Sequence, residues 1–212
     1  MFNSIRSTIE QSLKKVWFNV VLLGLPGAGK GTQGEMLAKK YNLVYISTGK
    51  MLRREIKNDT EIGRIAKPYM EAGEIVPDEI AVKLIERKIK KNSSANGFIF
   101  KGFPRTIVQA YILDGLLRRL NSRVSVMLDM RVPVLESVKR LAERGRTDSA
   151  RIYDASTELI VKRLEQYEKK TTPVIDYYKK QNKYVGILGQ ADKEEIFDRL
   201  SSAIDEAYSK IR

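Results

Sequence analysis

A glycine-rich turn between a short apolar run and a helical stretch constrains this chain most. Residues 24–32 read Gly-Leu-Pro-Gly-Ala-Gly-Lys-Gly-Thr and directly follow the apolar run Phe18–Leu23. Glycines at these offsets let the backbone curl so that successive N–H groups point at one anion, and the following helix N-terminus favours the same anion. Lys30 and Thr32 match the lysine and hydroxyl that contact phosphate and Mg²⁺ in this pattern, although Gly31 stands between them. The spacing predicts a nucleotide phosphate-binding loop and not a simple turn.

Short β-branched and aromatic runs alternate with helical stretches along the rest of the chain. The predicted strands are Phe18–Leu23, Val44–Ile46, Phe98–Phe100, Val124–Asp129 and Tyr184–Leu188. The predicted helices include Gly31–Tyr41, Asp78–Lys90 and Thr157–Gln181. This alternation favours a three-layer α/β fold, in which helices cover both faces of a central five-stranded parallel sheet. Ligands of such folds bind at the carboxyl ends of the strands, where the glycine-rich turn would lie.

The composition excludes several kinds of site. The 212 residues include no cysteine and no histidine, which rules out disulfides, cysteine-bound metal and imidazole catalysis. The net charge of +13 indicates either a generally basic, solvated surface or a surface that attracts polyanions, namely nucleic acid, an acidic membrane or phosphate-rich small molecules. Because the basic residues are spread out and accompany no nucleic-acid-binding motif, we expect no specific nucleic-acid partner. The longest apolar run, 16–25, is too short to cross a bilayer and no signal peptide precedes it, so we expect a cytoplasmic protein.

Residues 1–15 stand apart from the rest of the chain. Ile5, Ile9 and Leu13 recur at helical spacing, with basic residues on the other faces. We expect an amphipathic extension that packs on the body, and a single domain over residues 16–212. The alternative is a helix that binds a membrane surface or a partner, but we expect no membrane contact through residues 1–15.

The turn and several other segments together resemble the adenylate kinase family. The turn has the additional glycine of that family at position 31. The other matching segments, in chain order, are ISTGKMLR at 46–53, GEIVPD at 73–78, GFIFKGFPRT at 97–106 with Gln109, the pair Arg140 and Arg144, and TELIVKRLEQYEKKTTP at 157–173. The match begins at about Val20 and continues to the C-terminus. It implies a P-loop nucleoside-monophosphate kinase fold with a helical AMP-binding insertion over residues 47–76 and a short lid over residues 145–153.

The resemblance also implies a role for individual residues. Those implied for ATP binding are Gly27, Ala28, Gly29, Lys30, Gly31, Thr32, Arg140 and Ala191. Those implied for AMP binding are Thr48, Arg53, Ile75, Val76, Gly102, Arg105 and Gln109. Those implied for catalysis are Lys30, Arg105, Arg140, Arg144, Arg151 and Arg163. Guanidinium groups match phosphate oxygens in geometry and charge, and Thr48 with Gln109 favours AMP over pyrimidine monophosphates.

The lid departs from the family pattern. Arg151-Ile-Tyr-Asp154 replaces the usual R-x-D-D, and the interval from Arg151 to Arg163 is longer than the family's. Arg146-Thr-Asp148 is therefore a rival alignment for the lid arginine. Gly145 is interpreted either as a hinge or as a helix C-cap.

Lys50 and Lys101 stand where the family has the two aspartates that hold water around Mg²⁺. Two lysines should oppose a divalent cation placed between them and attract polyphosphate directly. Three interpretations follow: the lysines replace part of the metal's charge, the chain has lost phosphoryl transfer, or the lysines are peripheral and Thr32 with the phosphates holds Mg²⁺.

The resemblance implies an enzyme that moves the γ-phosphoryl group of ATP to AMP and so forms two ADP. Its implied cofactor is Mg²⁺, with a dependence that the two lysines alter or weaken. Its implied partners are ATP, AMP and ADP, and the family implies a monomer. The alternative is an impaired, nucleotide-binding pseudokinase that acts as a sensor or interaction module.

Overall fold

The computed structural model describes residues 17–147, 150–154 and 156–210. The expected amphipathic extension over residues 1–15 lies outside the described residues, as does Asp148 of the rival lid alignment. None of the helices in the described ranges is long and apolar enough to cross a membrane.

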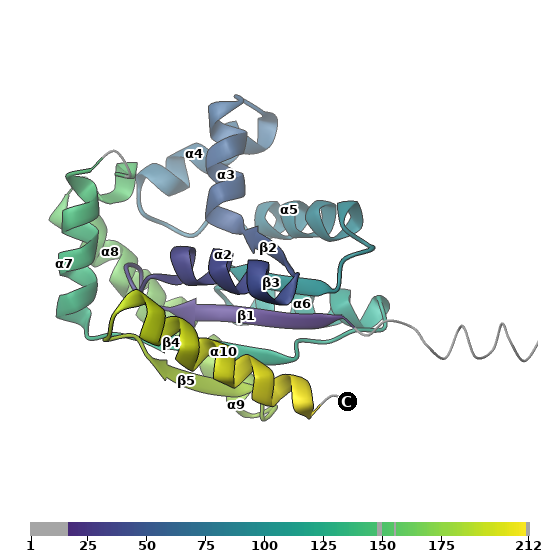
Figure 1. Cartoon of the computed structure of the whole chain (residues 1–212). Helices are drawn as coiled ribbons and strands as arrows, with labels where there is room; N and C mark the ends of the chain where they lie inside the picture. The colour runs from purple at the N-terminus through teal and green to yellow at the C-terminus, as the bar shows by residue number, and fades with distance from the viewer. Residues whose placement is uncertain (1–16, 148–149, 155, 211–212) are drawn as a thin grey trace, which may run out of the picture.

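A five-stranded parallel sheet forms the centre of the fold (Figure 1). Its strands stand in the order β2 (Val44–Ser47), β3 (Gly97–Lys101), β1 (Phe18–Gly24), β4 (Val126–Arg131) and β5 (Tyr184–Leu188). Every neighbouring pair is parallel. This arrangement confirms the predicted α/β fold.

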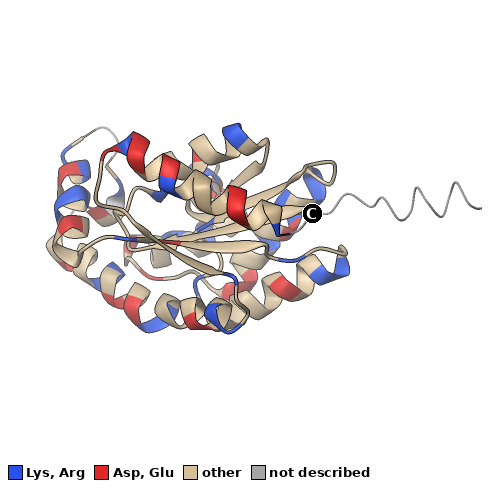
Figure 2. Ribbon diagram, turned by 60° about the horizontal axis from the view of Figure 1, so that its bottom comes forward, with Lys and Arg blue, Asp and Glu red and all other residues tan. Residues whose placement is uncertain are grey.

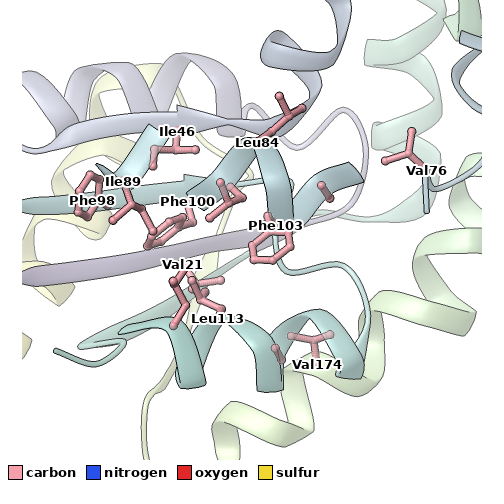
Figure 3. Close-up of a cluster of buried hydrophobic side chains, with 14 of the residues drawn as sticks. Val21, Ile46, Val76, Leu84, Ile89, Phe98, Phe100, Phe103, Leu113 and Val174 are labelled. Carbon is pink, nitrogen blue, oxygen red and sulfur yellow. The ribbon is translucent and has the colours of Figure 1, made fainter. Parts of the chain in front are cut away.

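Helices cover both faces of the sheet, which makes three layers. α2 (Lys30–Tyr41) and α10 (Lys193–Ser209) pack on one face, and α5 (Asp78–Lys91), α6 (Ile107–Arg119) and α9 (Thr172–Lys179) pack on the other. Side chains alternate across a strand, so Val20 and Leu22 of β1 enter the first core while Val21 and Leu23 enter the second. Figure 3 shows the second core, in which Val21 lies near Leu113 and Phe100. The burial of these apolar side chains holds the strand ends in place.

Two helical segments lie at the carboxyl end of the sheet. α3 (Thr48–Lys57) and α4 (Glu61–Glu71) follow β2 and fall within residues 47–76. α7 (Val134–Gly145), η1 (Ile152–Asp154) and α8 (Thr157–Gln166) follow β4. Figure 1 shows β1 pointing toward α7 and α8, and α4 contacts η1. The two helical segments therefore meet above the strand ends, where the predicted phosphate-binding loop lies.

Two predicted boundaries are wrong. The predicted helix Thr157–Gln181 is divided into α8, the π-helical turn η2 (Tyr167–Thr171) and α9. Pro173, in the first turn of α9, has no N–H for an α-helical bond, and the Thr172 amide donates to Tyr167 O across the wider turn. The predicted strand Val124–Asp129 begins later because the Ser125 hydroxyl, and not a main-chain carbonyl, accepts the Asn19 amide at 3.1 Å.

The outer surface carries charges of both signs. Figure 2 shows blue and red segments interspersed along the outer helices. Several of these charges form exposed ion pairs, such as Arg64–Asp59 at 3.2 Å and Lys179–Asp176 at 3.3 Å. Such pairs contribute little stability, but they break up the positive surface that nucleic acid would need.

Candidate active site

The glycine-rich turn joins β1 to α2 with a backbone that other residues rarely adopt. Gly24, Gly27 and Gly29 have φ values of 131°, 91° and 86°. A Cβ at Gly24 would lie 2.4 Å from Met130 O, and one at Gly27 would lie 2.7 Å from Ser137 O. A side chain at Gly24 would therefore clash with the backbone of β4 and one at Gly27 with the backbone of α7, and either would strain φ. The sequence predicted a curled loop here, and the loop is curled.

Lys30 is the first residue of α2 and its side chain folds back over the loop. Its Nζ donates to Gly24 O and to Leu25 O, both at 2.6 Å. Burial and the neighbouring cations Lys101 and Arg105 lower the pKa of Lys30 well below its usual value. An anion placed within the loop would offset both effects, so this lysine is poised for phosphate.

A cleft of about 430 Å³ opens above the loop. Most of the residues that we expect to bind substrate line this cleft: Gly27, Gly29, Lys30, Gly31, Thr32, Thr48, Ile75, Val76, Gly102, Arg105, Gln109, Arg140, Arg144, Arg151 and Arg163. Among the residues that the structure describes, Ala28, Arg53 and Ala191 are not part of this lining. Ala28 is buried and its amide donates to Leu25 O within the turn, at 3.1 Å. Ala191 packs against the core beneath α2 and α10.

The cleft is strongly positive. Its described lining includes seven basic residues, Lys30, Lys101, Arg105, Arg140, Arg144, Arg151 and Arg163. Glu74 is the acidic residue of that same lining, and its carboxylate is already paired with Lys162 at 2.8 Å. A site with this excess of fixed positive charge binds polyanions.

A buried carboxylate binds the arginines of the lid. Asp154 has a fully buried side chain and accepts two bonds from Arg144, at 2.7 Å each, in fork geometry. Arg163 Nη1 lies 3.4 Å from the same carboxylate, and the Arg151 amide donates to it at 3.2 Å. Sequence reasoning missed this role for Asp154, although it stands in the RIYD segment that departs from the family pattern. The Asp154 carboxylate thus holds Arg144, Arg151 and Arg163, which come from three segments, beside the same cleft.

The described residues of the lid bear on two alternatives that the sequence left open. Arg151 lines the cleft, whereas Arg146 does not appear among its described lining residues. The residue that caps α7 is Arg146, with φ of −95°, so Gly145 is not a left-handed C-cap. A Cβ on Gly145 would instead lie 2.7 Å from Asp154 O. Glycine is needed there because α7 and η1 approach closely.

Tyr153 connects the lid to the helical insertion. Arg53 on α3 donates to the Tyr153 hydroxyl at 2.8 Å, and the Arg163 guanidinium lies 4.0 Å from the centre of the ring. Burial alone would raise the pKa of Tyr153, but Arg151, Arg53 and further arginines outweigh it and lower that pKa. Arg53 thus reaches the cleft wall through Tyr153, a contact that the sequence did not reveal.

The other wall of the cleft has the features expected of a base pocket. Thr48 is buried, and its hydroxyl has no hydrogen-bond partner among the described residues. Gln109 Nε2 donates to Asp78 at 2.7 Å, and its Oε1 accepts from the Arg105 amide at 2.7 Å. One amide N–H of Gln109 is left for a ligand. Thr48 and Gln109 are therefore the free polar groups of a wall completed by apolar Ile75 and Val76.

The two lysines that replace family aspartates are separated in the structure. Lys101 ends β3 and lines the cleft. Lys50 is 73% exposed on α3, is not among the described lining residues, and lies 3.4 Å from Glu35. The expectation of two lysines facing one cation is therefore wrong for Lys50, because helical rotation carries it away from the side on which Thr48 lines the cleft.

Lys101 makes the stability of the ligand-free protein sensitive to pH. Burial, and then Arg151, lower its pKa from 10.5 to about 7. The charged form therefore opposes folding most strongly below pH 7, and this penalty fades as the pH rises toward 10.5. We expect Lys101→Met to raise the melting temperature of the ligand-free protein by roughly 3–8 °C near neutral pH and by much less above about pH 9. Thermal melts followed by circular dichroism test this, and an equal gain at both pH values would contradict it.

Comparison with known proteins agrees with this geometry. A family model described as adenylate kinase matches residues 22–183. The chain belongs to the adenylate kinase family. An adenylate kinase of Flavobacterium psychrophilum is 43% identical over 187 residues, which cover 88% of this chain and 98% of the relative. An adenylate kinase of Parabacteroides distasonis is 46% identical over 187 residues, covering 88% and 97%. One of Methanothrix thermoacetophila is 38% identical, covering 89% and 99%.

Proposed function

We propose that this member of the adenylate kinase family transfers the γ-phosphoryl group of ATP to AMP and forms two ADP. The observation that supports it best is one cleft that joins the lysine of a phosphate-binding loop to arginines from the β3–α6 loop and the lid. The relatives named above are adenylate kinases over nearly their whole length.

The two substrates have separate places in this proposal. The loop residues Gly27–Thr32 and Arg140 hold the ATP phosphates, with Ala191 close to the ATP base. Thr48, Gln109 and the backbone at Ile75 and Val76 hold the adenine of AMP, while Gly102, Arg53 and Arg105 hold its phosphate. The partly free amide of Gln109 and the unpaired Thr48 hydroxyl support this assignment.

Phosphoryl transfer needs position and charge more than it needs a base. In our proposal Lys30, Arg105, Arg140, Arg144, Arg151 and Arg163 surround the transferring group and stabilise the negative charge that spreads over its oxygens. Asp154 holds Arg144 and Arg163 in position, so these side chains are ordered before the substrate arrives. Closure of the lid segment 145–153 over the insertion 47–76 excludes water from the reacting atoms.

Members of the adenylate kinase family use Mg²⁺ together with ATP, but the side chains of this cleft do not fit a metal held by the protein. Mg²⁺ in such sites is usually held through one or two carboxylates and the substrate phosphates. Thr32 supplies a hydroxyl, but Lys101 stands at the strand end where the family pattern has a carboxylate. The described residues contain no group of three or more acidic side chains that could hold a metal.

We further propose that the enzyme is a cytoplasmic monomer whose partners are ATP, AMP and ADP. All the groups named above come from one chain, so catalysis requires no second copy. Interspersed surface charges give no support to a specific nucleic-acid partner.

The direct test is ADP formation from ATP plus AMP, first with excess EDTA and then with Mg²⁺ restored. Turnover in either condition supports phosphoryl transfer. Nucleotide binding without turnover in both conditions would contradict it and would point to a pseudokinase. Replacement of AMP by UMP or CMP should reduce turnover, because those bases cannot use Thr48 and Gln109 in the same way.

Thr48→Val should separate substrate binding from stability. Valine matches threonine in shape but lacks the hydroxyl, which is buried here without a partner. Removing an unpaired buried group should leave the ligand-free melting temperature unchanged or higher, whereas loss of a bond to AMP should weaken AMP binding by about 5–10-fold. Calorimetric titration with AMP and a thermal melt measure the two effects. A fall in both, in proportion, would show that the hydroxyl has a structural role instead.

A further inference from the structure

Lys101 lies at the base of the phosphate-binding loop without a partner among the described residues. It ends β3, and Leu22 of the neighbouring strand β1 is its register partner, just before the loop begins at Gly24. No hydrogen bond or ion pair joins the Lys101 side chain to another described residue, although the side chain lines the cleft. The position therefore puts an uncompensated cation beside the loop lysine.

The charged groups around Lys101 add to this imbalance. Lys101 lowers the pKa of Lys30, after the effect of burial, and Arg151, Arg105, Arg53 and Arg163 in turn lower the pKa of Lys101. Five cations therefore lie within electrostatic reach of Lys101: Lys30, Arg53, Arg105, Arg151 and Arg163.

The nearby carboxylates already have partners. Glu74 pairs with Lys162, Asp154 with Arg144 and Arg163, and Glu136 with Arg140 at 2.7 Å. Asp129 accepts from Tyr184 and is not among the described lining residues. Asp129 acts on the pKa of Lys30 in the opposite direction, but less strongly than Lys101, Arg105 or Arg163, so most of the positive charge at the base of the cleft is left for a ligand to balance.

We propose that this cleft selects metal-free ATP over its magnesium complex, with the Lys101 ammonium group contacting the terminal phosphates directly. The inference rests on the proposed function, because it takes ATP as the donor. Mg²⁺ neutralises part of the charge of ATP, and Lys101 and Lys30, which both line the cleft, would repel it. Metal-free ATP brings more negative charge and no repulsion, so it matches an excess of cations better.

The test is calorimetric titration of the full chain with ATP alone, in excess EDTA and in saturating Mg²⁺, without AMP. We expect metal-free ATP to bind the natural chain at least about ten-fold more tightly. Lys101→Asp should reverse the preference, and Lys101→Met, which only removes the charge, should reduce it to within about three-fold. Lys39→Asp is the matched control, because it changes the net charge equally at an exposed position on α2 and should keep the preference.

The possible outcomes separate the preference for metal-free ATP from the proposed phosphoryl transfer. Equal or tighter binding of Mg-ATP by the natural chain would overturn the inference, as would an unchanged preference in both Lys101 variants. If Lys101→Asp does not fold, Lys101→Met decides the matter alone. ADP formation alongside tighter binding of Mg-ATP would leave the proposed function standing without the inference. Tighter binding of metal-free ATP with no ADP formed under any condition would do the reverse, and no ATP binding at all would overturn both.

Discussion

Lys30→Met should reduce kcat/KM for ADP formation by about 10²–10³-fold while leaving the fold intact. Lys30 is the cation that the loop holds closest to its own carbonyls, at 2.6 Å from Gly24 O and Leu25 O. Methionine keeps the unbranched shape of lysine but has no charge to follow the transferring phosphoryl group. Gly24, one of the two residues whose carbonyls Lys30 contacts, lines the cleft, where water can replace the ammonium group.

The same substitution should have the opposite effect on stability. Burial and neighbouring cations lower the pKa of Lys30, so its charge opposes the folded state when no ligand is bound. The melting temperature of Lys30→Met should therefore equal or exceed that of the natural chain. Lys39→Met, an exposed lysine on the same helix, should change neither quantity. A Lys30→Met protein with nearly natural turnover, or one that loses activity because it melts early, would contradict our assignment.

Asp154→Asn should lower both stability and turnover, because it leaves the lid arginines without their buried counter-charge. Removing one partner of a buried ion pair costs about 3–5 kcal/mol. Arg144 and Arg163 remain 24% and 14% exposed and can regain some water, so the loss should be smaller. We expect about 2–4 kcal/mol, seen as a melting temperature lower by roughly 5–15 °C.

The effect on rate should come through position. Arg144 and Arg163 would no longer share one anchor, and misplaced charges stabilise the transferring group less well, so kcat should fall at least about ten-fold. Asp176→Asn is the matched control, since the Asp176 side chain is 64% exposed and its ion pair with Lys179 should contribute under about 1 kcal/mol. The Arg144→Met, Asp154→Asn double variant should be more stable than the sum of the single effects predicts. Strict additivity would show that the two groups do not depend on each other.

The sequence predicted the sheet and the loop because both depend on signals within a few residues. Apolar runs bounded by turn residues indicated five strands, and glycines at fixed offsets before Lys30 indicated the curled turn. The errors came where another group intervened. The proline at 173 divided a helix that periodicity alone predicted as continuous, and the Ser125 hydroxyl delayed the start of β4.

What the sequence by itself determined is the α/β fold, the phosphate-binding loop and membership of the adenylate kinase family. Only the tertiary structure decided which charges meet. Lys50 and Lys101 look equivalent as two missing aspartates, yet one lies on the exposed side of α3 and the other at a strand end in the cleft. Likewise, Asp154 anchors Arg144 and Arg163 only because α7, η1 and α8 pack together. The spacing of residues in the sequence determines the local backbone conformation. The electrostatic field at a site, in contrast, is a sum over charged groups that folding brings together from distant segments.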